Sequence, residues 1–117
     1  MLERLKRRAE FKDAAKGVRV GRDAFTLQAV RRNDRFAPKV GFTVTKRVGN
    51  AVVRNRIKRR LRALCDCDGL PFEAGTNYVI LARHAALRAT HGELSAALRS
   101  AVEASADRLQ RGMGKIS

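Results

Sequence analysis

Apolar and polar residues alternate in two stretches of the N-terminal half of the chain. In AFTLQAVR (24–31) and in PKVGFTVTK (38–46), every second side chain is apolar over most of the stretch. A period of two residues predicts strands with one buried face. The polar link RRNDRFA (31–37) has a length that suits an antiparallel hairpin, so the two strands are expected to pair with each other.

A helical period replaces this alternation in three other segments. The first predicts a short helix over residues 8–16 that stops at Gly17 and follows a loose basic N-terminal segment. The second begins after Asn50, a plausible cap, and has an apolar stripe at helical spacing. This stripe consists of Val53, Ile57, Leu61 and Leu64. The third is a terminal helix, whose start is indicated by Thr90 and Glu93 at capping-box spacing.

NYVILAR (77–83) differs from both patterns because it is apolar almost throughout. Such a run is typical of a strand covered on both faces, which places it at the centre of the sheet, and HAAL (84–87) follows as a short turn or helical piece. The order predicts an α+β fold, a single-domain α-β-β-α-β-α sandwich over residues 1–117 in which helices cover a small sheet. Residues 1–7 and 112–117 are expected to be flexible.

Charge narrows the class of partner. The chain has 26 Lys and Arg against 11 Asp and Glu, a formal net charge of +15. This balance points to a polyanion, with nucleic acid as the first candidate and an anionic membrane as its rival. No apolar run approaches the roughly 20 residues of a membrane-spanning helix, and MLERLKRRAE (1–10) lacks the apolar core of a signal peptide. We therefore expect a cytoplasmic protein without membrane contact.

The positive charge is concentrated on the second predicted helix. From Arg35 to Cys65 the sequence contains no acidic residue. Six basic residues occupy nine positions of this stretch: Arg54, Arg56, Lys58, Arg59, Arg60 and Arg62. Like charges three or four residues apart on a helix repel by roughly 0.2–0.5 kcal/mol per pair. A basic run is often only a solvated face, but the exclusion of carboxylates over this length favours a counter-charge on another molecule.

Catalysis by the chain itself has little support. His84 and His91 lie in no pattern that marks a nucleophile, a metal site or a carboxylate pair, although a histidine acid–base pair stays open as an alternative. Cys65 and Cys67 form a C-x-C without a second pair at zinc-site spacing, which favours free thiols over metal binding. A helix-turn-helix is disfavoured because a strand, not a helix, precedes the basic helix.

The most specific motif is KRVGNAVVRNRIKRRLR, residues 46–62. It closely resembles the signature of the protein subunit of bacterial ribonuclease P, whose GNAVxRNRxKRxxR core is present here without a gap. The resemblance extends to the basic N-terminal segment with its helical Phe11 and to NYVILAR followed by a terminal helix. It covers nearly the whole chain.

The resemblance implies an accessory subunit of a ribonucleoprotein enzyme. In that family the RNA subunit holds the active site and its Mg²⁺ ions, and the protein, one per RNA subunit, helps it to bind precursor tRNA and remove the 5′ leader. No residue of the chain is then expected to be catalytic or to ligate a metal. A binding-only protein, such as a ribosomal protein or an RNA chaperone, is the runner-up, and a self-sufficient nuclease that uses His84 or His91 is a third hypothesis.

The resemblance also assigns roles to individual residues. It implies contact with the catalytic RNA, with some side chains reaching the leader, for Arg54, Asn55, Arg56, Lys58, Arg59 and Arg62. It implies a leader-binding cleft between the first helix and the sheet, with contributions from Phe11, Lys46 and Arg83, although core packing is the ordinary role of such a phenylalanine. Ala15 and Gln28 stand where the family tends to have aromatics, which predicts a more electrostatic cleft.

One implication runs against a general rule of topology. The resemblance implies a left-handed crossover from one strand through the basic helix to the next parallel strand. About 98% of parallel crossovers are right-handed. The periodicity of the sequence gives no sign of the exception.

Overall fold

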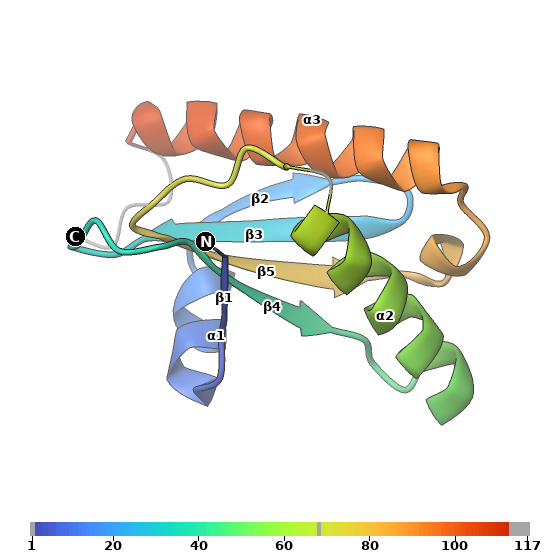
Figure 1. Cartoon of the computed structure of the whole chain (residues 1–117). Coiled ribbons are helices and arrows are strands. Elements are labelled where there is room, and N and C mark those ends of the chain that lie inside the picture. The colour runs from blue at the N-terminus through green and yellow to red at the C-terminus, as the bar shows by residue number, and fades with distance from the viewer. Residues whose placement is uncertain (1, 68, 113–117) are drawn as a thin grey trace.

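A five-stranded mixed sheet with helices on both faces forms the body of the molecule (Figure 1). The structure is a computed structural model that describes residues 2–67 and 69–112. The elements, in chain order, are β1 (Glu3–Arg4), α1 (Arg8–Ala15), β2 (Val18–Gly21), β3 (Phe25–Arg31), β4 (Lys39–Thr43), α2 (Ala51–Cys67), β5 (Thr76–Ala82), the short 3-10 helix η1 (His84–Leu87) and α3 (His91–Gln110). Their order across the sheet is β1-β4-β5-β3-β2.

The central position of β5 follows from its composition. It pairs antiparallel with β3 and parallel with β4, so both of its edges are hydrogen-bonded. Tyr78 and Ile80 lie in the larger hydrophobic cluster, while Val79 lies in the smaller one on the opposite face. An alternating strand would leave polar side chains on one of these faces. The predicted central strand and the α+β class are therefore confirmed.

The predicted hairpin between β3 and β4 is wrong. β5 lies between these two strands, and the hairpin that exists joins β3 to β2 through Arg22–Ala24. The sequence does carry the alternation of β2, because Val18 and Val20 are buried while Arg19 is exposed, but four residues are too few for a firm prediction. Burying both faces of β5 requires neighbours on both edges, and this requirement separates β3 from β4.

Residues 3–5 pair and pack, although the sequence placed them in a loose N-terminal segment. Glu3 and Arg4 form β1, which runs parallel to β4, and Leu5 is buried. The N–H of Leu5 donates to the carbonyl of Val40 at 3.1 Å. Of the tail predicted as flexible, residues 113–117 lie outside the described residues.

Two hydrophobic clusters lie on the two faces of the sheet. The larger is enclosed between the sheet, α2 and α3. The smaller lies beneath α1 and consists of Leu5, Ala14, Val30 and Val79, with Phe11 and Leu81 at its edge. In Figure 1, α1 and α3 accordingly lie on opposite sides of the strands. On this face Thr26 and Gln28 of β3 are buried together with Val30 and Val79.

The helix boundaries agree with the sequence signals. Ile57, Leu61 and Leu64 of the predicted stripe are buried, and Val53 is partly buried. The Asn50 side chain caps α2 by accepting a hydrogen bond from the N–H of Val53 at 3.0 Å. At α3, the capping box forms in both directions between Thr90 and Glu93. Among the described residues, no helix is both long enough and apolar enough to cross a membrane.

Candidate nucleic-acid interface

The outward side of α2 has a groove of about 460 Å³ whose walls are cationic and polar. Its lining consists of Asn55, Lys58, Arg59 and Arg62. None of these side chains is a carboxylate. Asn55 and Arg59 are exposed, and Lys58 and Arg62 are half-buried. The structure thus gathers four of the six motif residues for which the sequence predicted RNA contact into one concave surface.

Arg54 extends this surface by one helical turn, because residues four apart share a helix face. The Nε atoms of Arg54 and Arg62 are both buried and make no hydrogen bond within the described part of the chain. A buried N–H without an acceptor costs about 1–3 kcal/mol. We call the set Arg54, Asn55, Lys58, Arg59 and Arg62 the basic flank.

Arg60 does not belong to the basic flank, although the sequence counted it among the uncompensated cations. One of its guanidinium nitrogens donates to the carbonyls of Ala86 and Leu87 at 2.6 and 2.9 Å, and the other donates to the carbonyl of Ala89. These carbonyls belong to η1 and the turn after it, so Arg60 ties α2 to the segment that follows β5. Arg56 is exposed. Arg60 therefore has hydrogen-bond acceptors within the protein itself.

The three residues predicted for a leader-binding cleft lie on or beside the α1 face of the sheet. Lys46 follows β4 and Arg83 follows β5, and because these strands are parallel, the two exposed cations lie at the same end of the sheet. Arg83 donates to Thr26 Oγ1 on this face at 2.9 Å. Phe11 is half-buried at the edge of the smaller cluster, so it packs against the core and still exposes part of its ring.

Gly41 allows the Phe11 ring to lie this close to the sheet. A Cβ added at Gly41 would stand 2.5 Å from two carbons of that ring, well inside van der Waals contact. Ala15, where the family resemblance expects an aromatic, is exposed, and Gln28 is buried in β3. This face therefore offers Phe11 as its aromatic contribution beside polar groups such as Thr26 and Gln28.

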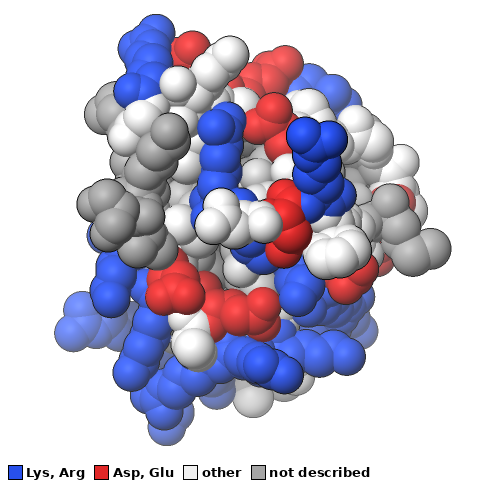
Figure 2. Space-filling view, turned by 90° about the vertical axis from the view of Figure 1, so that its left-hand side faces the viewer, with Lys and Arg blue, Asp and Glu red and all other residues white. Residues whose placement is uncertain are grey.

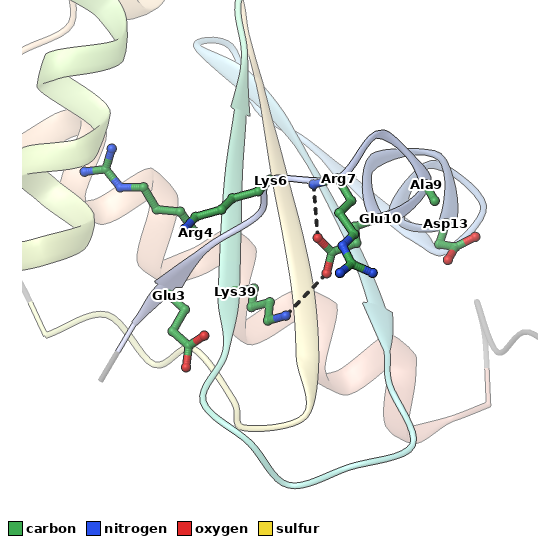
Figure 3. A pocket seen from close by; sticks show the side chains of 8 residues that line it. All are labelled: Glu3, Arg4, Lys6, Arg7, Ala9, Glu10, Asp13 and Lys39. Atoms are coloured by element: carbon green, nitrogen blue, oxygen red, sulfur yellow. Dashed lines mark hydrogen bonds and ion pairs between the residues drawn. The ribbon is translucent and has the colours of Figure 1, made fainter.

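A second concave region, at the N-terminal end, mixes charges of both signs. This hollow of about 510 Å³ lies between β1 and α1 (Figure 3). It is lined by Glu3, Arg4, Lys6, Arg7, Ala9, Glu10, Asp13 and Lys39. Figure 2, which views the molecule from the left of Figure 1, shows acidic and basic side chains next to one another on this side. No motif in the sequence marks this region.

Glu10 is the best-connected carboxylate of the hollow. It accepts hydrogen bonds from the backbone N–H of Arg7 at 3.2 Å and from Lys39 Nζ at 3.4 Å. Burial raises the pKa of Glu10, but the Arg7 N–H and the Lys39 charge outweigh it, so the pKa lies below its usual value. Lys39 therefore has a partner within the protein, which weakens its attraction for an external anion.

The histidines and cysteines do not assemble into a site. His84 and His91 are exposed on η1 and at the start of α3, and Cys65 is buried while Cys67 is exposed. Cys65 and Cys67 form no disulfide. In the part of the chain that the structure describes, no group of three or more His, Cys, Asp or Glu side chains lies close enough to hold a metal ion.

The chain is similar in sequence to one family of known proteins. Residues 2–105 match the model of the family described as Ribonuclease P. The ribonuclease P protein component of Brucella suis is 37% identical over 118 residues, covering 93% of this chain and 84% of that protein. That of Erythrobacter litoralis is 39% identical over 113 residues, covering 92% of both chains.

Solved structures give the same result for the fold. The RNase P protein of Staphylococcus aureus superposes with a TM-score of 0.68 at 25% identity, covering 92% of this chain and 94% of that one. The RNase P protein of Thermotoga maritima superposes with a TM-score of 0.67 at 23% identity, covering 84% of this chain and 96% of that one, and at this identity it supports the fold alone.

Proposed function

Because the chain belongs to the family of bacterial ribonuclease P protein components, we propose that its basic flank docks on the RNA subunit of the holoenzyme. The protein is a subunit of the ribonuclease P endoribonuclease and assists the removal of the 5′ leader from precursor tRNA. What the proposal adds is the surface through which this subunit acts.

The observation that carries the proposal is the groove on α2 lined by Asn55, Lys58, Arg59 and Arg62. Arginine presents a planar fork of donors that matches phosphate oxygens and base edges, and an ion pair of this kind is stronger than a neutral hydrogen bond. Arg54, one helical turn before Lys58, extends the same cationic surface. Arg56, on the other shoulder of α2, adds a further exposed cation to the proposed contact.

The leader of precursor tRNA is assigned to the α1 face, at Phe11, Lys46 and Arg83. Support comes from their placement, because Lys46 and Arg83 are exposed at the sheet end next to α2 while Phe11 exposes part of its ring on the same face. Contacts there are mainly electrostatic, since Ala15 and Gln28 replace potential stacking partners. The crossover from β4 through α2 to β5 is taken to be left-handed.

The chemistry is assigned to the RNA subunit. Mg²⁺ ions held there supply metal-assisted hydrolysis of the phosphodiester bond. The described residues offer no cluster of ligands that fits such an ion, so the protein's part is to bind and orient RNA. The proposed holoenzyme contains one protein per RNA subunit and processes precursor tRNA in the cytoplasm.

Cleavage of precursor tRNA at low Mg²⁺ tests the division of labour. The catalytic RNA alone, the protein alone and the mixture are compared, and only the mixture is expected to cut efficiently. Cleavage by the protein alone would instead favour a nuclease that uses His84 or His91, and a mixture no better than the RNA alone would favour a binding-only protein.

The salt dependence of protein–RNA binding tests the docking surface. Neutralising about six phosphates changes the logarithm of the affinity by roughly −4 to −5 per logarithmic unit of salt. A slope near zero would contradict docking through the basic flank.

A further inference from the structure

Among the described residues, two large apolar side chains are strongly exposed, Phe36 and Val52. The exposed fraction of Phe36 is 71%. Phe36 lies in the loop between β3 and β4, which in the sequence is a mainly polar link. Scattered apolar residues on a surface are common and need no explanation by themselves. The construction of this loop is what distinguishes Phe36.

Arg32 holds the loop from inside. Its guanidinium donates to the carbonyls of Phe36 and Ala37 at 3.1 and 2.9 Å and to the Asp34 carboxylate at 3.0 Å. It also reaches the end of β5, donating to the side-chain oxygen of Asn77 at 2.6 Å. Only 14% of the Arg32 side chain is exposed. One buried cation thus fixes the loop to the central strand.

The backbone of Phe36 is bound on both of its polar groups. Its N–H donates to Asp34 Oδ1 at 3.0 Å, and its carbonyl also accepts from the N–H of Gly75 at 2.8 Å. Gly75 adopts a φ of +74°, and a Cβ there would stand 2.3 Å from the carbonyl oxygen of Asp34. The ring of Phe36 therefore extends into solvent from a backbone that is already ordered, so little further ordering is required on binding.

Charge around the ring favours RNA over an apolar partner. Arg35, the residue before Phe36, is exposed, and the Asp34 carboxylate beside it is taken up by Arg32. An exposed aromatic ring with a cation beside it fits an unpaired base and its phosphate, because the base stacks on the ring while the cation neutralises the backbone. A purely apolar partner would leave this arginine without counter-charge.

The position of the loop favours the 5′ leader of precursor tRNA as the RNA that Phe36 contacts. The loop precedes β4 and Lys46 follows it, so the two lie at opposite ends of this strand, which spans about 16 Å at ~3.3 Å per residue. If α2 docks on the catalytic RNA as proposed above, the leader nucleotides nearest the cleavage point lie by Lys46 and Arg83, at the same end as α2. Nucleotides further upstream then run across the sheet toward Phe36.

We propose that Phe36 stacks on an unpaired base of the 5′ leader, upstream of the nucleotides bound at the α1 face, with Arg35 contacting an adjoining phosphate. This inference rests on the proposed function, since it takes the docking of α2 as given. Stacking of one base on an aromatic side chain corresponds to about 5- to 150-fold in affinity.

The test measures the affinity of the reconstituted holoenzyme for two precursor tRNAs that differ only in leader length, about 4 and about 16 nucleotides, the range that small single-strand-binding domains cover. Phe36→Ala is expected to weaken binding of the long-leader precursor about 5- to 150-fold and to leave the short-leader precursor unchanged. Phe36→Trp should retain the wild-type affinity, whereas Phe36→Leu, which is apolar but lacks a π face, should behave like Ala. The melting temperature of all three variants should match that of the wild type, because the ring is exposed.

Equal losses on both precursors, or no loss on either, would overturn the proposal, as would a wild-type affinity for Phe36→Leu. Sedimentation of the protein alone tests the alternative that the ring contacts a second copy of this chain. Self-association of the wild type that is lost in Phe36→Ala would show that alternative and overturn the proposal. The short-leader precursor tests the proposed function independently of the role of Phe36. If its cleavage still depends on both subunits, the proposed function holds whatever Phe36 does.

Discussion

The basic flank of α2 and the N-terminal hollow are both rich in cations, yet they differ in where the counter-charge lies. The hollow includes Glu3, Glu10 and Asp13 among its lining, and Lys39 is paired with Glu10 at 3.4 Å. The groove of the basic flank has no carboxylate in its lining, and two of its arginines keep buried Nε atoms without an acceptor. A count of Lys and Arg therefore does not distinguish the two regions; the absence of acidic residues from the lining of the groove does.

The same contrast recurs within α2 itself. Arg59 and Arg60 are adjacent, but Arg59 lines the open groove while Arg60 donates to three backbone carbonyls. Adjacent residues on a helix point about 100° apart, so one cation can face solvent while the next lies against η1. Whether a cation of this motif is structural therefore depends on the hydrogen-bond acceptors within reach of its side chain.

Charge reversal gives the largest expected difference between the two regions. The double variant Lys58→Glu/Arg59→Glu should weaken binding to the RNA subunit by at least about 100-fold, because it places carboxylates against phosphates. Lys6→Glu/Arg7→Glu, with the same change in net charge at the hollow, should weaken it no more than about threefold. Both affinities are measured by filter binding at one salt concentration. Equal losses would mean that net charge, not the local surface, determines binding.

Truncation of neighbouring arginines should separate structural from RNA-binding cations. Arg60→Ala removes the donor for three carbonyls and is expected to lower the free energy of unfolding by about 2–4 kcal/mol. Arg59→Ala should change it by less than about 0.5 kcal/mol and should instead weaken holoenzyme assembly. Urea denaturation measures the first effect and RNA titration the second. A large loss of stability in Arg59→Ala would assign that side chain to the fold.

Packing, more than charge, should anchor the N-terminal end. Gly41→Ala introduces a Cβ against the Phe11 ring and is expected to cost about 1–3 kcal/mol of unfolding free energy, because the ring must move away from β4. Gly21→Ala is the matched control, since a Cβ there meets nothing within 4 Å. Thermal unfolding of the two variants makes the comparison. An unchanged Gly41→Ala would mean that α1 is not held through Phe11.

The smallest effect concerns Glu10 and pH. The pKa of Glu10 is lower in the folded state than in the unfolded chain, so the unfolded chain binds the proton at a higher pH. The contribution of Glu10 to stability is therefore fully present above about pH 4.5. It is lost as the pH falls through the folded-state pKa. Glu10→Gln should therefore lower stability at pH 7 by a few tenths of a kcal/mol and by less near pH 3. Urea midpoints at both pH values measure the difference. A constant difference would contradict an ion-pair role.

The local elements of this protein could be predicted from short-range patterns. The stripe of Ile57, Leu61 and Leu64, the Asn50 cap and the Thr90–Glu93 capping box lie within a few residues of one another, so the sequence specifies them directly. The apolar run of β5 likewise determined its central place. The gathering of Asn55, Lys58, Arg59 and Arg62 on one side of α2 followed from the same helical period.

Only the tertiary structure decided which distant segments meet. The insertion of β5 between β3 and β4 excluded the expected hairpin, and the approach of η1 to α2 supplied carbonyl acceptors to Arg60, which the sequence shows only as one of six basic residues. Likewise Arg32, a polar loop residue in the sequence, became the anchor of the Phe36 loop through its contact with β5. These outcomes depend on hydrogen bonds between residues far apart in the chain, such as the 26 positions that separate Arg60 from Ala86, and no local period encodes such contacts.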